Sequence, residues 1–302
     1  MFDKKVISLL PSATEIICAL GLENQLVGRS FEGEFPDFVK RLPSCTFAAG
    51  TSSKNSKNAN SPDLSAADEV DMHLLKTLQP DVIFTLAQGE ESEDELRSAF
   101  EHSVQQWTGK NAEVVFLKAD SLEAVKSNIL LIAQKLGVTS RGEVLVEDLT
   151  ERVEIIRHKL KFFADRPVVA FLQSLDPLVA AGPTVRELIK VAGGSPATGY
   201  EEERLLTPEL LAQSDADVLI IGVPGWSVAT TLQKISMLLQ FPGWVELRAV
   251  KNDQVFIVDG TRYFRSGGPM MVDSLEILAE ILRPDQFVFG FEGEAWLKFG
   301  VS

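Results

Sequence analysis

The stretch VISLLPSATEIICALG, residues 6–21, decides the fold of the first part of the chain. Its first five residues are almost wholly apolar, which is typical of a short buried strand. Ser12 follows Pro11 and lies three residues before Glu15, which is the spacing of a helix capping box. Apolar residues then recur at helical spacing, and we expect the helix to stop at Gly21. The stretch therefore predicts a buried strand, a turn and an amphipathic helix capped by Ser12.

The same stretch has the outline of a secretory signal, because two lysines precede an apolar run. A signal needs about 7–15 uncharged apolar residues. Here Pro11 interrupts the run early, and Glu15 adds a charge. We therefore expect a cytoplasmic protein from the chain as given, and a periplasmic or cell-surface protein if a signal has been removed.

The composition bounds the class of protein. Of the 302 residues, 45% are hydrophobic and 24% are charged, which suits one large or two medium globular domains. The formal net charge of −14 argues against nucleic acid and anionic membranes as partners, and no lysine or arginine cluster stands out to override it. No apolar stretch reaches the ~20 residues of a membrane span, so we expect no membrane insertion.

Two cysteines are too few for a disulfide framework, and we expect Cys18 to be a buried free thiol.

Strands and helices alternate along most of the chain, which predicts an α/β fold with parallel sheets. The exception is SRGEVLVEDLTERVEIIRHKLKFFA, whose apolar residues keep helical spacing throughout. We therefore expect an N-terminal α/β lobe over residues 1–139, a connecting backbone helix over 140–164, and a C-terminal α/β lobe with an aromatic tail over 165–302. In parallel sheets ligands lie at the carboxyl ends of the strands, so two Rossmann-like lobes predict a ligand cleft between them.

Seven segments in order carry a resemblance to a known family: ISLLPSATEIICALGL, LVGRSFEGEFP, LLKTLQPDVIFT, FLQSLDPL, LIKVAGG, LLAQSDADVLII and VDGTRYFRSGGP. The chain resembles, from about residue 5 to residue 283, the cobalamin-binding branch of the helical-backbone (class III) substrate-binding proteins of ABC importers. The resemblance implies two lobes joined by one helix, a monomer without catalytic activity, and cobalamin or a related corrinoid as a non-covalent ligand held between the lobes.

The resemblance also implies a set of ligand-binding residues at strand ends. In the N-terminal lobe these are Ser12, Phe35, Pro36, Phe47 and Gln88. In the C-terminal lobe Gln173 and Asp176 follow strand VVAFL, Trp226 follows VLIIG, and Tyr263 and Phe264 follow VFIVDG. Other interpretations stay open for some of these residues and their neighbours. Phe35 and Phe47 can be ordinary core residues, and Asp259 can form a turn. Arg29 can contact the ligand, although a salt bridge within its lobe is favoured.

The chain departs from the family at two places. Relatives often carry histidine and cysteine where this chain has Phe31-Glu32-Gly33, and its three histidines lie in or near helices away from any metal-ligand spacing, so we expect no metal site. Importer-associated relatives usually present one glutamate per lobe to arginines of the permease. Glu209 matches the C-terminal position, but His73 stands at the N-terminal one, with Asp71 as a substitute.

Three alternatives to a corrinoid-binding protein stay open. The same cleft can bind a ferric siderophore or haem. An enzyme can use Ser12 as a nucleophile, although no G-x-S-x-G surrounds it, with Glu15, Glu32, Glu34 or Asp176 as acid or base. An intracellular descendant can serve as a protein-binding scaffold.

Overall fold

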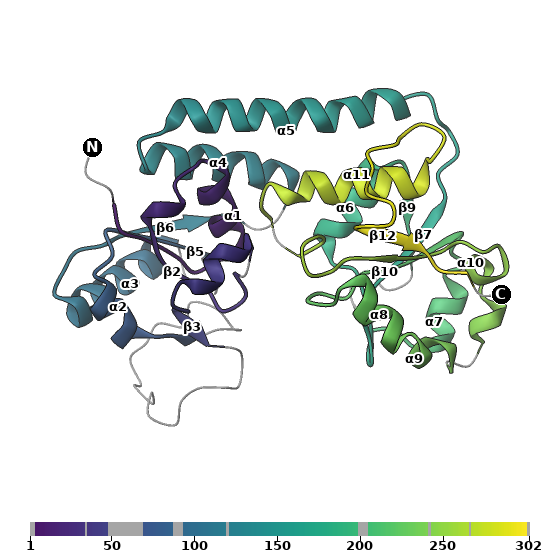
Figure 1. Ribbon diagram of the computed structural model, residues 1–302, viewed down its shortest axis with the longest axis horizontal. Helices are drawn as coiled ribbons and strands as arrows, with labels where there is room; N and C mark the ends of the chain where they lie inside the picture. The colour runs from purple at the N-terminus through teal and green to yellow at the C-terminus, as the bar shows by residue number, and fades with distance from the viewer. Residues whose placement is uncertain are drawn as a thin grey trace. The chain divides into compact units, whose positions relative to one another are not determined.

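The computed structural model describes residues 4–33, 35–47, 69–86, 93–118, 121–198, 205–240, 243–265 and 267–300 (Figure 1). The chain divides into two compact units, which are described separately. The first unit comprises Met1–Asp148 and Gly267–Pro269, and the second comprises Leu149–Ser266 and Met270–Ser302.

The first unit is built on a parallel sheet with the order β2-β1-β5-β6. Its strands are β1 (Val6–Ser8), β2 (Leu26–Arg29), β5 (Val82–Leu86) and β6 (Glu113–Leu117). Ile7 lies opposite both Gly28 and Ile83, and the strands are apolar because helices cover both faces of the sheet. A separate antiparallel pair is formed by β3 (Thr46–Phe47) and β4 (Glu69–Val70).

The helices of the first unit pack on the two faces of this sheet in pairs, α1 with α4 and α2 with α3 (Figure 1). They are α1 (Pro11–Ala19), α2 (Met72–Leu78), α3 (Glu93–Thr108) and α4 (Leu122–Lys135), with short 3₁₀ helices η1 (Glu23–Gln25) and η2 (Asp37–Arg41). Leu75, Phe100 and Val104 bury their side chains against the face that carries Ile7 and Ile83. The side chains of successive strand residues therefore pack against helices on opposite faces of the sheet.

The long helix α5 spans Thr139–Leu160 and ends four residues before the expected boundary at 164. Its last half belongs to the second unit, where Arg152 donates to both carboxylate oxygens of Glu276 at 2.9 and 2.6 Å and contacts Asp273. The hydrogen bond with Glu276, followed by the one with Asp273, raises the pKa of the Arg152 guanidinium. This ion-pair cluster holds α5 against α11 (Met270–Leu282).

The second unit has a mixed sheet with the order β12-β11-β10-β7-β8, and β9 pairs with β7. Its strands are β7 (Val168–Leu175), β8 (Leu178–Ala180), β9 (Ser195–Pro196), β10 (Val218–Ile221), β11 (Val255–Val258) and β12 (Trp296–Lys298). The central strands are parallel as expected, but β8 and β12 run antiparallel to their neighbours. The aromatic tail thus joins the sheet of its own unit through β12.

Helices cover both faces of this second sheet. They are α6 (Pro183–Val191), α7 (Pro208–Gln213), α8 (Val228–Lys234), α9 (Ser236–Leu239), η3 (Trp244–Glu246), α10 (Arg248–Lys251) and α11. α6 packs against α11, whereas Leu211 of α7, Ile235 and Leu238 pack with the strand residues Leu219 and Ile257. The expectation of an α/β fold with parallel sheets and covering helices is confirmed.

Both cysteines are free thiols, and we expect them to be unreactive in the folded protein. Cys45 is buried and Cys18 is half-buried, and burial is the main cause that raises the pKa of each thiol to about 12. At about pH 8 roughly one thiol in 10,000 is then ionised, and the thiolate is the reactive form. A colorimetric thiol reagent should modify the native protein far more slowly than the urea-unfolded chain. Equal rates in the two states would contradict this prediction.

Candidate ligand-binding edges of the two units

Arg29 organises the loop that follows β2 at the carboxyl edge of the first sheet. Its side chain is buried, and it donates to the carbonyl oxygens of Val39 at 3.1 Å, Ser30 at 2.8 Å and Phe31 at 3.0 Å. Among the described residues Arg29 makes these three carbonyl contacts and no salt bridge, so the salt bridge suggested by the sequence is corrected. Phe31 is further held by its own amide, which donates to Thr46 Oγ1 at 2.8 Å.

Helix α1 begins two residues earlier than the capping-box pattern predicts, because its N-cap is residue 10 instead of residue 12. Leu10 is the N-cap residue, no side chain caps the helix, and Pro11 occupies its first turn. Proline is favoured there because its missing amide hydrogen needs no partner. Ser12 is therefore a buried residue inside the helix rather than its cap. Thr14 fixes the turn instead, by donating to Ser8 Oγ at 3.0 Å.

Glu15 does not complete a capping box either. It is buried in α1 and lies beside Gly268, where a side chain on the glycine would come within 2.8 Å of the Glu15 carboxyl carbon. The segment Gly267–Pro269 belongs to the first unit by its contacts. Glu15 therefore serves the close packing of this segment on α1.

Phenylalanines gather on the loop and 3₁₀ helix that follow β2. Phe35 is half-buried and joined to Pro36 by a cis peptide bond, and Pro36 precedes η2. Phe31 and Phe38, which sequence reasoning missed as site residues, leave 47% and 42% of their surfaces exposed. Their spacing in FEGEFPDF was the available signal, since an aromatic residue recurs every three or four positions.

The remaining predicted residues of the first unit are less informative. Phe47 is half-buried at the end of β3. Gln88 lies outside the described residues.

The loops after β10 and β11 are tied to each other at the carboxyl edge of the second sheet. Gly225 donates from its backbone to the Gly260 carbonyl at 2.8 Å, and Gly260 donates to the Trp226 carbonyl at 2.9 Å. Asp259 accepts from the amide of Thr261 at 2.8 Å and so forms the expected turn. The two loops therefore form one rigid backbone element.

Trp226 stands on this element with part of its indole exposed. The ring packs in part against the core of the second unit, and the Lys234 ammonium lies 4.0 Å from its centroid, within cation–π range. Lys234 is itself exposed at the end of α8. The pair presents an aromatic face with a positive charge beside it.

Gln173 lies inside β7 and not on the loop after it, because β7 continues to Leu175. Its side-chain nitrogen donates to the Phe264 carbonyl at 3.4 Å, and its oxygen accepts from the Gly182 amide at 3.3 Å. Asp176 is exposed in the two-residue turn between β7 and β8. The structure therefore brings Gln173, but not Asp176, to the loop that carries Phe264.

Tyr263 and Phe264 follow β11 as predicted, but their side chains are buried. Burial raises the pKa of the Tyr263 hydroxyl, and its ring meets Phe291 edge-on at 6.0 Å. Phe264 packs on Phe171 with ring centroids 5.0 Å apart, and its amide donates to Ser274 Oγ at 3.0 Å. In this structure both residues hold the loop in place.

The two candidate docking carboxylates differ in their surroundings. Glu209 is exposed in the first turn of α7, where hydrogen bonds from its own backbone amide and then from Thr207 lower its pKa. Asp71 is the N-cap of α2 and accepts from the Leu74 amide at 3.0 Å. Of the two, Asp71 is engaged in holding a helix end.

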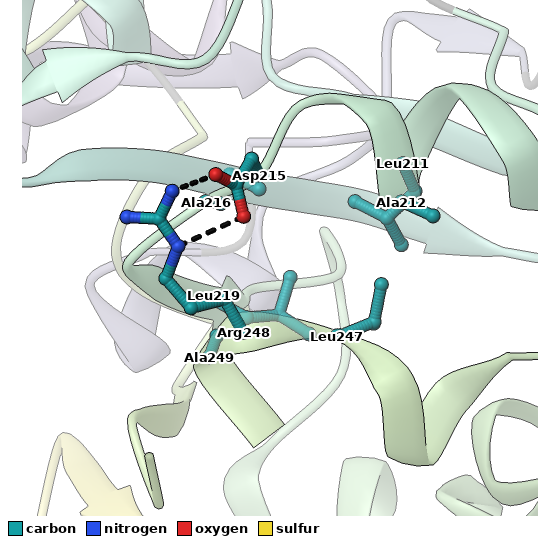
Figure 2. Close-up of a pocket in the computed structure, with 9 residues that line it drawn as sticks. Leu211, Ala212, Asp215, Ala216, Leu219, Leu247, Arg248 and Ala249 are labelled. Carbon is teal, nitrogen blue, oxygen red and sulfur yellow. Dashed lines mark hydrogen bonds and ion pairs between the residues drawn. The ribbon is translucent and has the colours of Figure 1, made fainter. Parts of the chain in front are cut away.

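A pocket in the second unit (Figure 2) lies near the amino ends of the strands, away from the carboxyl edge of the sheet. Ala170 and Leu219, early in their strands, line it together with residues of α7 and α10. Arg248 closes one side by donating to Asp215 at 2.8 Å and to Asp217 at 2.6 Å. With room for about one water molecule, this pocket is too small for an organic ligand.

Metal-binding clusters and membrane-spanning helices are both absent from the described residues. No group of three or more histidine, cysteine or acidic side chains there could hold a metal ion. None of the helices described is long and apolar enough to cross a membrane.

Comparisons with known proteins agree with this arrangement. The family model described as "Periplasmic binding protein" matches residues 6–261. The ABC transporter substrate-binding lipoprotein YvrC of Bacillus subtilis is 26% identical over 294 residues, which cover 94% of this chain and 81% of YvrC.

Solved structures share the fold at lower identity. The periplasmic haem-binding protein RhuT of Roseiflexus sp. RS-1 has a TM-score of 0.70 at 22% identity, over 94% of this chain and all of that one. The periplasmic vitamin B12-binding protein BtuF of Vibrio cholerae has a TM-score of 0.68 at 19% identity, over 95% of this chain and 99% of that one. Because these relatives are described as periplasmic or as a lipoprotein, they give no support to a cytoplasmic location. With most of its length matched by the family model, the chain belongs to the periplasmic binding protein family.

Proposed function

We propose that this protein is a non-catalytic binding protein that captures a bulky, largely apolar ring ligand, cobalamin or a related corrinoid, for an ABC importer. The observation that carries the proposal is the set of aromatic side chains left exposed or half-exposed at the carboxyl edges of both sheets. Ligand pockets combine such apolar faces with a few placed polar groups.

The first unit would contribute the phenylalanines of residues 31–38. Large apolar side chains seldom stay exposed without a binding role when they cluster. Arg29 fixes the backbone of this loop through three carbonyl contacts, so the Cα atom of Phe31 is held in place. A planar or corrin ring can cover these side chains and remove their surface from water.

The second unit would contribute Trp226 and its neighbour Lys234. The backbone hydrogen bonds between Gly225, Gly260 and Trp226 hold the indole on a rigid element, which lowers the entropy lost on binding. Lys234 adds a cation that suits an amide- or carboxylate-edged ligand. An apolar ring with polar edges matches this combination.

The available side chains favour a corrinoid over haem. Haem iron is normally held by an axial histidine, cysteine, methionine or tyrosine. Within residues 30–33, 35–38, 222–227 and 259–265, Tyr263 is the one residue of these types, and its side chain is buried. The cobalt of cobalamin carries its own axial base, so it needs no such ligand from the protein.

A transporter partner follows from the relatives. YvrC is described as a substrate-binding lipoprotein of an ABC transporter, and the exposed Glu209 carboxylate can meet an arginine of a permease. We therefore propose that the protein acts outside the cytoplasmic membrane, like its relatives. We propose in addition that it acts as a monomer. In the first unit Asp71 is a poor second contact because it caps α2.

The proposal is tested by calorimetric titration with cyanocobalamin, dicyanocobinamide and haemin. We expect one corrinoid molecule to bind per chain, more tightly than haemin. Trp226→Ala should weaken that binding about tenfold or more, as for an aromatic anchor. Trp107→Phe, a conservative change at a tryptophan that packs in the core of the first unit, is the matched control and should leave the affinity unchanged. The absence of any binding heat with both corrinoids would refute the proposed ligand. Tighter binding of haemin than of the corrinoids would show that the protein is a haem-binding protein instead.

A further inference from the structure

Two large apolar side chains of the second unit are almost fully exposed. Phe162, just after α5, leaves 84% of its surface in solvent, and Val288, after α11, leaves 88%. These are the two highest values among the large hydrophobic residues that the structure describes. Neighbouring Phe289 is also exposed. Large apolar side chains that are exposed together typically mark a binding surface.

Contacts between the ends of α5 and α11 bring the two segments together (Figure 1). Lys159 donates to the Gln286 carbonyl at 3.0 Å, and its ammonium lies 5.0 Å from the centre of the Phe287 ring. Arg283 lies 5.5 Å over the Phe163 ring and also donates to the Asp165 carbonyl. Phe162 and Val288 thus sit on segments that form one surface, which we call the basic aromatic end: residues 157–166 and 283–289.

The charge of the basic aromatic end is opposite to that of the whole protein. Four of the ten residues 157–166 are lysine or arginine and one is acidic, in a chain with a formal net charge of −14. Arg283 adds a further cation, whereas the acidic side chains nearby are Glu154, which pairs with Arg157 at 2.9 Å, Asp165 and Asp285. Lys161 lies 5.7 Å over the exposed Phe162 ring. Exposed apolar tips flanked by cations therefore stand out from an acidic surface.

We propose that the basic aromatic end docks onto an anionic lipid surface. Apolar tips that enter the interface, combined with lysine and arginine near the headgroups, are what interfacial binding requires. A second copy of this chain fits less well, because a two-fold contact would place like charges opposite each other. The end lies where residues 165–167 lead into the amino end of β7, whereas the ligand loops of this unit follow the carboxyl ends of its strands. Docking therefore leaves the loops that carry Trp226 free.

Vesicle co-sedimentation tests the proposal independently of ligand binding. The full chain should sediment with vesicles of phosphatidylcholine and phosphatidylglycerol at about 7:3, and not with phosphatidylcholine alone. The bound fraction should fall several-fold between about 0.05 M and about 0.3 M NaCl, because salt screens the attraction.

Matched variants separate the apolar and the charged contributions. Phe162→Ser combined with Val288→Ser, and Lys161→Glu alone, should each lower the bound fraction about fivefold or more. The controls Val144→Ser, at an exposed residue of α5, and Lys76→Glu, at an exposed residue of α2, should change it little. All three test side chains are exposed, so circular dichroism should show unchanged folding.

Three outcomes would overturn the proposal. One is the absence of binding to anionic vesicles, and another is equal binding to neutral and anionic vesicles. The third is a dimer without lipid, seen by sedimentation velocity and abolished by Phe162→Ser, which would assign the basic aromatic end to a second copy.

Discussion

Replacing Gly260 with alanine should destabilise the protein by about 3 kcal/mol, at the upper end of what overpacking usually costs. An added Cβ would lie 2.6 Å from the carbonyl carbon of Val223 and would overlap its oxygen. Backbone atoms cannot move aside here, because Gly260 both donates to Trp226 and accepts from Gly225. We expect urea unfolding, followed by tryptophan fluorescence, to show an earlier transition for the second unit.

The same change should also disturb ligand binding, because it displaces the loop that carries Trp226. The matched control is Gly300→Ala, where no atom lies within 4 Å of the added Cβ. Gly225→Ala should fall between the two, since its φ of +81° strains an alanine although the space is open. A Gly260→Ala variant as stable as the Gly300→Ala control would show that the two loops are not packed as described.

Replacing Glu280 with alanine should cost about 3–5 kcal/mol, because it leaves several buried donors without an acceptor. The Glu280 side chain is buried in α11 and accepts from the amides of Phe289, Gly290 and Phe291 and from the Trp296 indole, the last at 2.9 Å. Trp296 is the first residue of β12, so the Glu280 carboxylate holds residues 289–296 in the position from which β12 joins the sheet.

Limited proteolysis and urea unfolding would measure this effect. The Glu280→Ala variant should be cleaved within residues 287–300 much faster than the parent protein. The matched control is Asp285→Ala, an exposed carboxylate shortly after the same helix, which should change stability by less than about 0.5 kcal/mol. Equal stability of the two variants would show that the tail does not depend on Glu280.

The regular elements of this fold were predictable because each has a strong local pattern. The strand Val82–Leu86 is a short apolar run after Pro80, and α5 keeps helical spacing over its whole length. The β7–β8 hairpin was missed because its turn is two residues long and β8 has only three, too few to show a period. The start of α1 was misplaced because a serine and a glutamate three residues apart imitate a capping box, whereas Pro11 sets the first turn.

The candidate site was predictable only in part, because exposure depends on contacts between distant segments. Trp226 follows a strand end as expected, but nothing local to Tyr263 or Phe264 shows that their rings meet Phe291 and Phe171. The basic aromatic end was overlooked for the same reason. Its basic residues in 157–166 are visible in the sequence, but their partner Arg283 lies more than a hundred positions away.

The proposed function rests on a corrinoid that binds to the aromatic loops at the carboxyl edges of the sheets. Hydrogen–deuterium exchange with mass spectrometry, with and without saturating cyanocobalamin, tests it most directly. We expect the ligand to slow exchange in residues 31–40, 223–228 and 259–265, and to leave exchange in residues 157–166 unchanged. Unchanged exchange in all of these loops at saturating ligand would contradict it.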